Sequence, residues 1–321
     1  MGVEAAFDDF QGVVNADEGR VTIARERRDV FKKAFKAESD VAEVFGSGSL
    51  ARSTQLDPVH DVDLVIVYRP GDHPDWGQPG ESAREALEHA RERVKYLLGA
   101  TDGTIDQLVR YTLPRDRAVK CFIDRPGFED AFTVDAMPVL RQANGTLLIP
   151  SKRSGEWTTA DPEYLIEAVA VHQRDWEHFR AMVRMLKRWR LSVPTKVKSL
   201  VMEVLALQCM PRSGTRPQAL RAFFTAAAIQ VNWGVNDPAG HCGPVQADLD
   251  IPVLREALEE ARNAATRACA LDADGDTDEA QRAWQEVFGS DFPAPEKKNV
   301  SPAITGPALI TSRPIRDAPQ G

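Results

Sequence analysis

The chain has 321 residues, and its 48 Asp and Glu outnumber its 40 Lys and Arg, which gives a formal charge of −8 at pH 7. Hydrophobic residues make up 43% and charged residues 27%, as in ordinary globular proteins, so disorder throughout is excluded. At about 150 residues per domain, this length predicts one large domain or two that share a core. Because an acidic protein lacks the positive field of a general DNA or RNA binder, we expect small-molecule partners.

The sequence shows no pattern for membrane insertion or export. It has no run of the ~18 apolar residues that a spanning helix needs, and its acidic first ten residues do not resemble a signal peptide. We therefore expect a cytoplasmic protein that makes no membrane contact. The cysteines are far apart and form no CxxC pair, so they are predicted to be reduced thiols; they are Cys121, Cys209, Cys242 and Cys269.

The first half of the chain mixes helix and strand patterns. Apolar residues at helical intervals predict a helix over 21–35, and two apolar runs rich in β-branched residues predict strands over 41–45 and 62–68. Residues 50–54, between these strands, allow about one helical turn. A charged amphipathic helix is predicted over 81–98. The other strand candidates are 105–111, 118–123, 132–134 and 147–149.

The second half has helical patterns. Asp161 and Pro162 are typical of a helix cap and first turn, and they open a helical pattern that runs to Trp189. Further helices are predicted over 198–208, 217–230, 253–270 and 278–288. The proline-rich end up to Gly321 predicts an extended or disordered tail. We therefore expect an α+β protein, divided into a mixed core with an N-terminal helix (1–160), a helical domain (161–290) and a tail (291–321).

A glycine-serine turn follows the first predicted strand. Gly48 and Ser49 begin the pattern Gly-Ser-x-x-x-x-Thr, which ends at Thr54. Glycine lets backbone N–H groups approach an anion, a helix N-terminus attracts negative charge, and the hydroxyl of Ser47 or Ser49 can donate to phosphate oxygens. The segment is therefore predicted to hold a phosphate group.

Three aspartates complete the candidate chemistry. Asp61 and Asp63 are two residues apart at the start of a strand, so their carboxylates point to the same face and offer the oxygens that Mg²⁺ prefers. Asp135 ends another short strand and is the candidate third acid. The alternative interpretation is that Asp135 is an acid at a strand end without a catalytic role. A third carboxylate would let a second ion bind, and two ions stabilise the entering and leaving oxygens of nucleotidyl transfer.

These motifs resemble the polymerase-β-like nucleotidyltransferase superfamily, and within it the cGAS/DncV-like nucleotidyltransferases (CD-NTases) of the oligoadenylate-synthase-like branch. Residues 48–54 and the following Asp-Val-Asp-Leu are similar to the GS(x)4T and DxDL patterns of that branch, and Asp135-Ala-Met-Pro is similar to its third acid. Lys187 and Ser199 lie where the family has a lysine and a serine on the donor triphosphate, and Asp237 lies in a similar Asp-Pro loop. The resemblance spans roughly residues 40–290.

The resemblance implies a polymerase-β-like core, with a mixed sheet and flanking helices, and a C-terminal helical domain that leaves the active site in the cleft between them. It implies two Mg²⁺ ions, with Mn²⁺ able to substitute, on Asp61, Asp63 and Asp135. It implies a nucleotide on Gly48, Ser49, Thr54, Lys187, Ser199 and Asp237. The implied activity joins NTPs, ATP among them, into a cyclic di- or trinucleotide second messenger of bacterial anti-phage (CBASS) signalling.

A basic stripe supports a triphosphate site in the second half. Arg180, Arg184 and Lys187 recur at helical spacing on a helix whose other face is apolar. Local positive charge in an acidic protein suits a bound triphosphate. The alternative for Arg180 and Arg184 is a solvated helix face, which is usual for charged runs.

Rival interpretations concern both the fold and the acceptor. Gly46-x-Gly48-x-x-Ala imitates a dinucleotide-binding fingerprint, but the acids open the second strand and no alternating strand-helix units follow. Transfer of a nucleotide to a protein, an RNA or a small molecule remains an alternative, as does a catalytically inactive scaffold. The three intact aspartates argue against the scaffold.

The resemblance also bears on partners. It implies NTP substrates, an effector reached through the product, and either a HORMA-type activator or a ubiquitin-transfer-like enzyme that acts on Gly321. A chance terminus is the alternative for Gly321. No zinc-thumb spacing is present, which argues against activation by double-stranded DNA.

Overall fold

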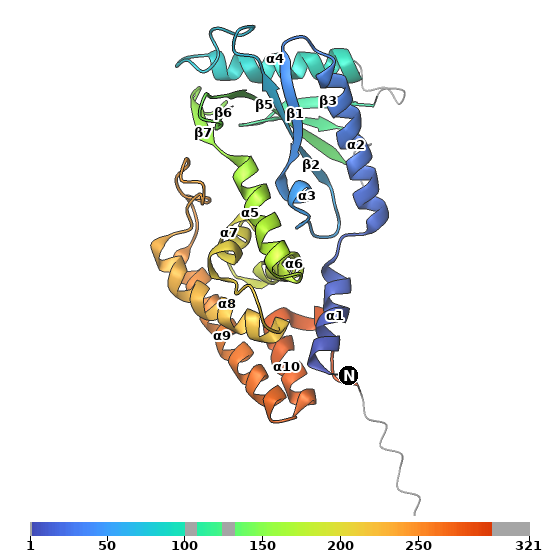
Figure 1. The fold of residues 1–321 in the computed structure, drawn as a ribbon, viewed down its shortest axis with the longest axis vertical. Helices are drawn as coiled ribbons and strands as arrows, with labels where there is room; N and C mark the ends of the chain where they lie inside the picture. The colour runs from blue at the N-terminus through green and yellow to red at the C-terminus, as the bar shows by residue number, and fades with distance from the viewer. Residues whose placement is uncertain (1, 100–107, 124–131, 297–321) are drawn as a thin grey trace, which may run out of the picture.

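The computed structural model describes residues 2–99, 108–123 and 132–296, and Figure 1 shows an elongated molecule with a β-sheet in one half and a stack of helices in the other. The predicted α+β fold is confirmed. Of the tail predicted over 291–321, only residues 291–296 are described, so Gly321 lies outside the described residues. Within the described part of the chain, no helix is long and apolar enough to cross a bilayer.

The sheet has seven strands in the described residues. In space, β1 (Val41–Ser47), β2 (Asp61–Tyr68), β5 (Thr133–Arg141), β4 (Val119–Phe122) and β3 (Tyr111–Pro114) follow one another, and β6 (Leu147–Pro150) and β7 (Trp157–Ala160) extend from β5. Only β2 and β5 are parallel among these described pairs. The sheet is therefore mixed, as predicted.

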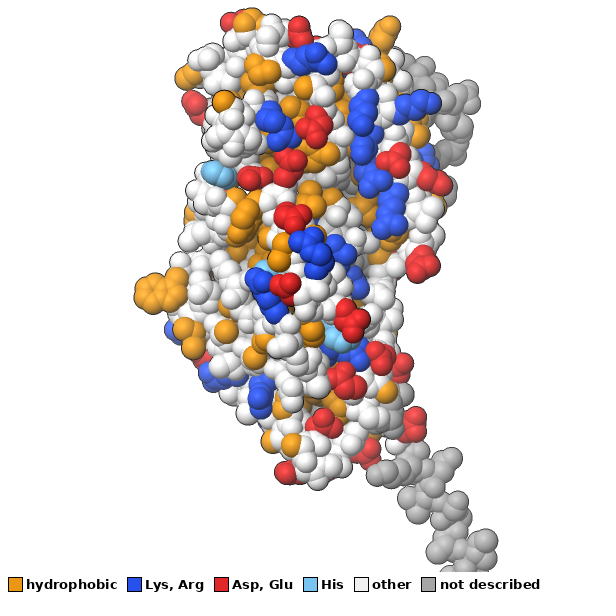
Figure 2. Space-filling view, viewed as in Figure 1, with side chains coloured by type: hydrophobic (Ala, Val, Ile, Leu, Met, Phe, Trp, Pro, Cys, Tyr) orange, Lys and Arg blue, Asp and Glu red, His pale blue; other side chains and the backbone are white. Residues whose placement is uncertain are grey.

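The two faces of the sheet differ. Alternate residues of β2, such as Leu64 and Ile66, pack with α2 (Glu18–Lys36) and α4 (Ser82–Leu98), which cover one face. Because side chains alternate along a strand, Asp61 and Asp63 point to the other face. Figure 2 shows Lys and Arg side chains gathered along α2. This basic surface lies across the sheet from the aspartates.

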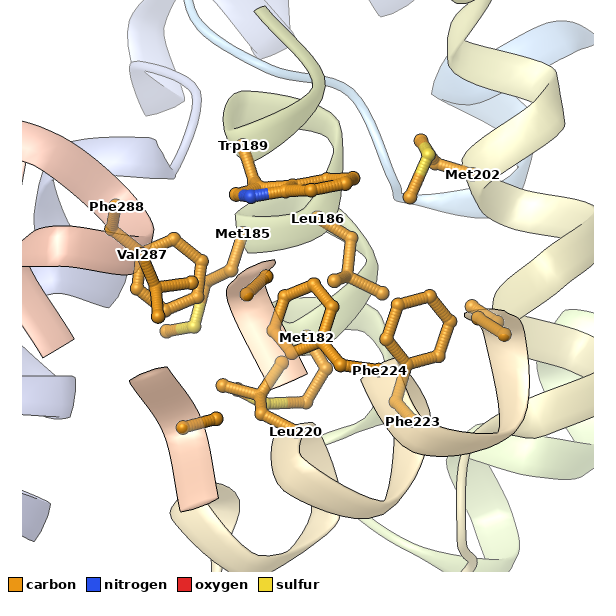
Figure 3. Packing of buried hydrophobic residues seen from close by; sticks show 14 of the residues in the cluster. Met182, Met185, Leu186, Trp189, Met202, Leu220, Phe223, Phe224, Val287 and Phe288 are labelled. Atoms are coloured by element: carbon orange, nitrogen blue, oxygen red, sulfur yellow. The ribbon is translucent and has the colours of Figure 1, made fainter. Parts of the chain in front are cut away.

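The helical half contains α5 (Pro162–Asp175), α6 (Phe179–Trp189), α7 (Ser199–Cys209), α8 (Arg216–Gln230), α9 (Ile251–Ala273) and α10 (Thr277–Phe288). Figure 3 shows its core, in which Met182, Leu186 and Trp189 of α6 pack against Phe223 and Phe224 of α8. The apolar face that was predicted opposite the basic stripe is therefore the side of α6 that packs into this core.

Three elements differ from the sequence prediction. The helix predicted over 162–189 is two helices, because Trp176 takes an extended conformation and buries its indole between them. No glycine or proline marks this break. Helix α1 (Val3–Val14) was not predicted, and it packs on the helical half through Phe7 and Phe10. Strand β7 was also missed. Of the strand predicted over 105–111, residues 105–107 lie outside the described residues, and β3 begins only at Tyr111.

Candidate active site

The parallel pairing of β2 and β5 brings the three predicted acids together. Asp63 lies directly opposite Asp135, and Asp61 lies opposite Thr133. Neighbouring strands are about 4.8 Å apart, and residues paired in register point to the same face. Residues 72 positions apart in the sequence therefore share one small surface, as predicted from the motif alone.

Asp61 is held by two neighbours. The Lys120 ammonium lies 2.8 Å from its Oδ1, and the Thr133 hydroxyl donates to the same oxygen. Burial raises the pKa of Asp61, but the hydrogen bonds from Lys120 and Thr133 outweigh it and keep the pKa below its ordinary value. Lys120 was not among the predicted site residues, because only the register of β4 places it opposite Asp135.

The pKa values of Asp63 and Asp135 are shifted in the direction opposite to that of Asp61. Burial raises the pKa of both carboxyls, and that of Asp135 rises to about 6 because burial is reinforced by the charges of Asp63 and Asp61. The Oδ1 atom of Asp135 is buried and has no hydrogen-bond partner within the described residues. Repelling, desolvated carboxylates with an unsatisfied oxygen are the environment that a bound cation relieves.

The glycine-serine turn contacts one of these acids. Gly48 starts the short helix α3 (Gly48–Arg52) with φ of 67°, and a Cβ atom there would lie 1.6 Å from Oδ2 of Asp63. Only glycine tolerates both the left-handed conformation and this approach. Ser47, the last residue of β1, pairs with Asp63 in the register, and Ser49 follows in α3. The turn and the acids therefore form one site.

A cleft of about 480 Å³ opens over this site, and we call it the acid cleft. Asp63, Asp135, Ser47 and Gly48 line its floor, together with Arg52. The other lining residues are Leu64, Met137, Arg115, Asp116, Arg117, Ala118, Pro162, Leu165 and Leu200. The volume lies in the range of small-molecule sites. Because α5 and α7 supply part of the wall, the acid cleft lies between the two halves.

Two arginines at the mouth of the acid cleft were also missed. Arg115 and Arg117 flank Asp116 in the turn between β3 and β4. Asp116 accepts hydrogen bonds from the Ser151 hydroxyl and the Arg153 N–H, so its charge is bound within the turn. The two guanidinium groups add positive charge beside the acids, where a phosphate would need it.

Lys187 and Thr54 lie beneath α3 and do not line the acid cleft. The Lys187 side chain is 2% exposed, and its ammonium donates to the carbonyl oxygen of Thr54 at 2.8 Å and forms an ion pair with Glu203 of α7. Glu203 also accepts from Arg52, with 2.6 Å between Nε and Oε2. Burial raises the pKa of Glu203, but the two cations outweigh it and lower that pKa. This buried network joins α3 to α6 and α7.

The other predicted ligands lie in separate places. Ser199 is the first residue of α7, immediately before Leu200 in the wall of the acid cleft. The Asp237 carboxylate accepts from the N–H groups of His241 and Cys242, both at 3.0 Å, and so closes its own loop. Arg184 donates to the Ser53 carbonyl oxygen at 2.8 Å and lines a different hollow together with Arg180.

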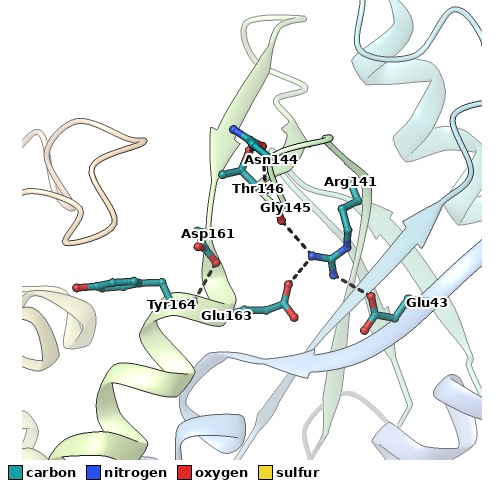
Figure 4. Close-up of polar contacts among 8 residues, drawn as sticks. All are labelled: Glu43, Arg141, Asn144, Gly145, Thr146, Asp161, Glu163 and Tyr164. Carbon is teal, nitrogen blue, oxygen red and sulfur yellow. Dashed lines mark hydrogen bonds and ion pairs between the residues drawn. The ribbon is translucent and has the colours of Figure 1, made fainter.

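A second polar network fixes the start of α5. Figure 4 shows Arg141 of β5 between Glu163 of α5, at 2.7 Å, and Glu43 of β1, at 2.8 Å, while Asp161 caps the helix through the N–H of Tyr164. Arg141 also donates to the Gly145 carbonyl oxygen. The wall of the acid cleft at Pro162 and Leu165 is therefore tied to the sheet that carries the acids.

These residues fit divalent cations. Asp61, Asp63 and Asp135 offer hard oxygen ligands, and the unpaired oxygen of Asp135 and the repulsion among the carboxylates favour a cation between them. Within the described residues the three acids do not all bring an oxygen within 4.8 Å of one another. The Oδ1 atom of Asp61 is paired with the Lys120 ammonium, at 2.8 Å.

Comparison with known proteins agrees with this geometry. The SMODS family, described as the Second Messenger Oligonucleotide or Dinucleotide Synthetase domain, matches residues 1–172, more than half of the chain. The chain belongs to the SMODS family. The expected relation to the CD-NTases is thereby confirmed, and this SMODS protein is a nucleotidyltransferase.

Similar proteins extend the match over the whole chain. A probable cyclic nucleotide synthase of Bacillus cereus (strain VD146) is 24% identical over 91% of this chain and 98% of its own, and a cyclic AMP-AMP-AMP synthase of an Acinetobacter species is 21% identical over 97% and 92%. CdnC of E. coli MS115-1, solved with ATP, has a TM-score of 0.69 at 19% identity over 91% of this chain and 99% of its own. The complex of CdnC with HORMA-deltaN gives 0.68 at 18%, over 91% and 98%. The structures share the fold.

Proposed function

We propose that this SMODS protein condenses NTPs, ATP among them, into a cyclic di- or trinucleotide and releases pyrophosphate. The observation that carries the proposal is the acid cleft, where Asp63 and Asp135 face each other beside Gly48 and Asp135 has an unsatisfied buried oxygen. The names of the two relatives, which describe cyclic nucleotide synthases, support a cyclic product.

The carboxylates of Asp61, Asp63 and Asp135 would hold divalent cations, for which we propose Mg²⁺, with Mn²⁺ able to substitute. The cations would stabilise the charge that develops on the entering and leaving oxygens. Asp135 comes from a different strand than the other two acids, and we assign it to the acceptor side. The acceptor hydroxyl attacks the α-phosphorus in line, a new phosphodiester bond forms, and pyrophosphate leaves.

The chain's own groups position the donor nucleotide. The hydroxyls of Ser47 and Ser49 and the N–H groups at Gly48 bind the triphosphate, and Arg115 and Arg117 add positive charge at the mouth of the acid cleft. Arg52 lines the cleft while Glu203 fixes its guanidinium group. Rigid donors lower the barrier because they need no reorganisation during the reaction.

Lys187 acts in this scheme as a positioning residue. Its ammonium holds Thr54, at the end of the glycine-serine turn, and Glu203, which in turn holds Arg52. A direct contact of Lys187 with the outer phosphates stays a prediction, and it requires that the ammonium exchange Glu203 for a phosphate. Ser199 and Asp237 stay predicted nucleotide ligands as well, and of these two Ser199 is the one next to the wall of the acid cleft.

The nucleotide choice and the partners rest on the similar proteins. One solved structure of CdnC contains ATP, and one relative is named a cyclic AMP-AMP-AMP synthase, so adenine is the base we propose first. The complex of CdnC with HORMA-deltaN supports a HORMA-type activator over an enzyme acting on Gly321. A cyclic product would act through an effector, as in CBASS anti-phage signalling in the cytoplasm.

The test incubates the full chain with Mg²⁺ and each labelled NTP, alone and combined, followed by phosphatase treatment and separation of the products. We expect a labelled product that survives phosphatase in the wild type, no such product with Asp61→Asn or Asp135→Asn, and wild-type yield with Asp274→Asn, which changes an exposed acid at the C-terminal end of α9. Label that appears on a protein, RNA or small-molecule acceptor instead would favour the alternative transferase. Wild-type yield with either Asp61→Asn or Asp135→Asn would contradict the catalytic role proposed for that aspartate.

A further inference from the structure

Two histidines and an aspartate meet at the far end of β2 from the acid cleft. The Nε2 atoms of His73 and His89 lie 3.0 and 3.1 Å from the same oxygen, Oδ2 of Asp40. The three ligand atoms all lie within 4.8 Å of one another. Asp40 precedes β1, His73 lies in the loop after β2, and His89 lies in the middle of α4. We call these three side chains the His-His-Asp cluster.

The His-His-Asp cluster is separate from the catalytic acids. Asp40 adjoins Val41, which pairs with Tyr68 at the end of β2, whereas Asp63 lies near the start of that strand. Five residues of strand separate Asp63 from Tyr68, or about 17 Å at ~3.3 Å per residue. The two groups therefore cannot share one ion.

Aromatic side chains enclose the cluster. Trp76 stacks on the His73 ring with centroids 3.9 Å apart, and the Tyr68 ring meets both imidazoles edge-on at 5.3 Å. The Tyr68 hydroxyl is buried and has no hydrogen-bond partner within the described residues. Buried hydroxyls nearly always have a partner, so the unpaired Tyr68 hydroxyl beside these three side chains offers a further polar group to a bound ion.

We propose that the His-His-Asp cluster binds Zn²⁺ through Nε2 of His73, Nε2 of His89 and Oδ2 of Asp40. Imidazole nitrogens with one carboxylate suit zinc and similar transition metals, whereas Mg²⁺ prefers oxygen ligands alone. Zinc bonds of ~2.0 to 2.1 Å in a tetrahedron place ligand atoms about 3.3 Å apart, so small movements of the side chains suffice. The fourth position is left for water or the Tyr68 hydroxyl.

Charge around the cluster also permits a cation. The guanidinium group of Arg93 on α4 forms an ion pair with Glu38, so its positive charge is offset, and the guanidinium group of Arg69 donates to the carbonyl oxygen of Val41. Asp40 supplies a carboxylate, and both imidazoles lie within hydrogen-bond distance of its Oδ2 atom. Zinc bound here would fasten the loop after β2 and helix α4 to the start of β1, which is a structural role.

The test titrates Co²⁺, a spectroscopic substitute for Zn²⁺, into the metal-free full chain. Excess Mg²⁺ is present throughout, so that it occupies the catalytic acids and keeps Co²⁺ from binding there. We expect one Co²⁺ per chain, visible ligand-field absorption without a thiolate charge-transfer band, and displacement by one equivalent of Zn²⁺. Asp40→Asn, His73→Gln and His89→Gln are each expected to weaken binding by at least about 10-fold. His178→Gln, a histidine on another part of the molecule, is expected to leave binding unchanged.

A measurement on the wild type alone guards against variants that do not fold. Pulsed electron paramagnetic resonance of bound Cu²⁺ is expected to show two imidazole nitrogens. Any of three results would overturn the proposal. The first is absence of Co²⁺ binding at sub-millimolar concentration, and the second is a single imidazole or a thiolate ligand on the bound metal. The third is unchanged binding in all three folded variants. The cluster would then be a hydrogen-bonded contact and no metal site.

Discussion

Gly48 and Asp63 approach each other so closely that they constrain one another. Gly48→Ala would place a methyl group 1.6 Å from the carboxylate oxygen in a left-handed conformation, so either Asp63 or the turn must move. Because small displacements of catalytic groups have large effects, we expect product formation to fall by about 100-fold or more. Initial rates of pyrophosphate release measure this change.

Gly46→Ala is the matched control, because its added methyl group meets only the flexible end of Arg28, at 3.0 Å. We expect this variant to keep most of its activity. Equal losses in the two variants would mean that the strand and its turn tolerate no side chain, and the specific contact with Asp63 would then not explain the glycine.

The raised pKa of Asp135 predicts that the free energy of unfolding of the metal-free protein is smaller at neutral pH than at low pH. This pKa is raised from 3.8 to about 6 in the folded state, so ionisation opposes folding, and stability present at low pH is lost as the pH rises through this range. The full effect is up to ~3 kcal/mol, and partial exposure reduces it to roughly 1 kcal/mol. We expect metal-free Asp135→Asn to be more stable than the wild type by this amount near pH 7.

Urea unfolding in the presence of a chelator measures the difference. The gain in the free energy of unfolding is expected to shrink as the pH falls from 7 and to disappear near pH 3, below the pKa of Asp135 in both the folded and the unfolded state. Added Mg²⁺ is expected to stabilise the wild type more than the variant. A gain that is the same at both pH values would show that the ionisation of Asp135 is not its cause.

At the scale of elements, Glu203 links α7 to α3 and α6. Glu203→Gln would leave Arg52 and Lys187 as buried cations without their carboxylate, and breaking a buried pair costs about 3–5 kcal/mol. We expect a loss of this size in the free energy of unfolding. Glu167→Gln, which removes an exposed pair with Arg174, is expected to change stability little. A small loss with Glu203→Gln would mean that the network is not a structural support.

Much of the element order was predictable, because it rests on local patterns. The runs around β1, β2 and β4 and the helices α7 to α10 have clear periodicity, and Asp61 and Asp63 open β2 as predicted. Asp135 was expected at the end of a short strand over 132–134, but β5 runs from Thr133 to Arg141 and Asp135 is its third residue. Apart from the approach of Asp135 to Asp63, which the motif predicted, contacts between distant segments were not predictable. Lys120 reaches Asp61 only through the register of β4, and Glu203 meets Lys187 only after two helices pack. The same holds for the His-His-Asp cluster, whose residues come from three separate segments.

At the scale of the whole molecule, the two ends of the described chain meet in the helical half. Phe7 of α1 contacts Trp284 of α10 with centroids 5.0 Å apart and Phe292 at 4.9 Å, and all three side chains are buried. Phe7→Ala would leave a cavity in this core, so we expect a loss of about 3–5 kcal/mol in the free energy of unfolding. Denaturant unfolding measures it.

Val13→Ala, on the exposed side of the same helix, is the control and is expected to have little effect. A comparable loss in both variants would contradict burial of Phe7 as the cause, because alanine has a higher helix propensity than either residue that it replaces. The buried residues of α1 recur at helical spacing, so the sequence carried a signal for this helix that the prediction overlooked.

The central claim is that the acid cleft closes NTPs into a ring, and the ratio of pyrophosphate released to nucleotide joined tests it most directly. Ring closure releases one pyrophosphate for every nucleotide in the product and leaves no terminal triphosphate. A linear product of n nucleotides releases n−1 and keeps one triphosphate. We predict a ratio of one in the wild-type reaction and no release with Asp61→Asn, with mass spectrometry showing a product without terminal phosphates. A ratio below one together with a retained triphosphate would contradict the account.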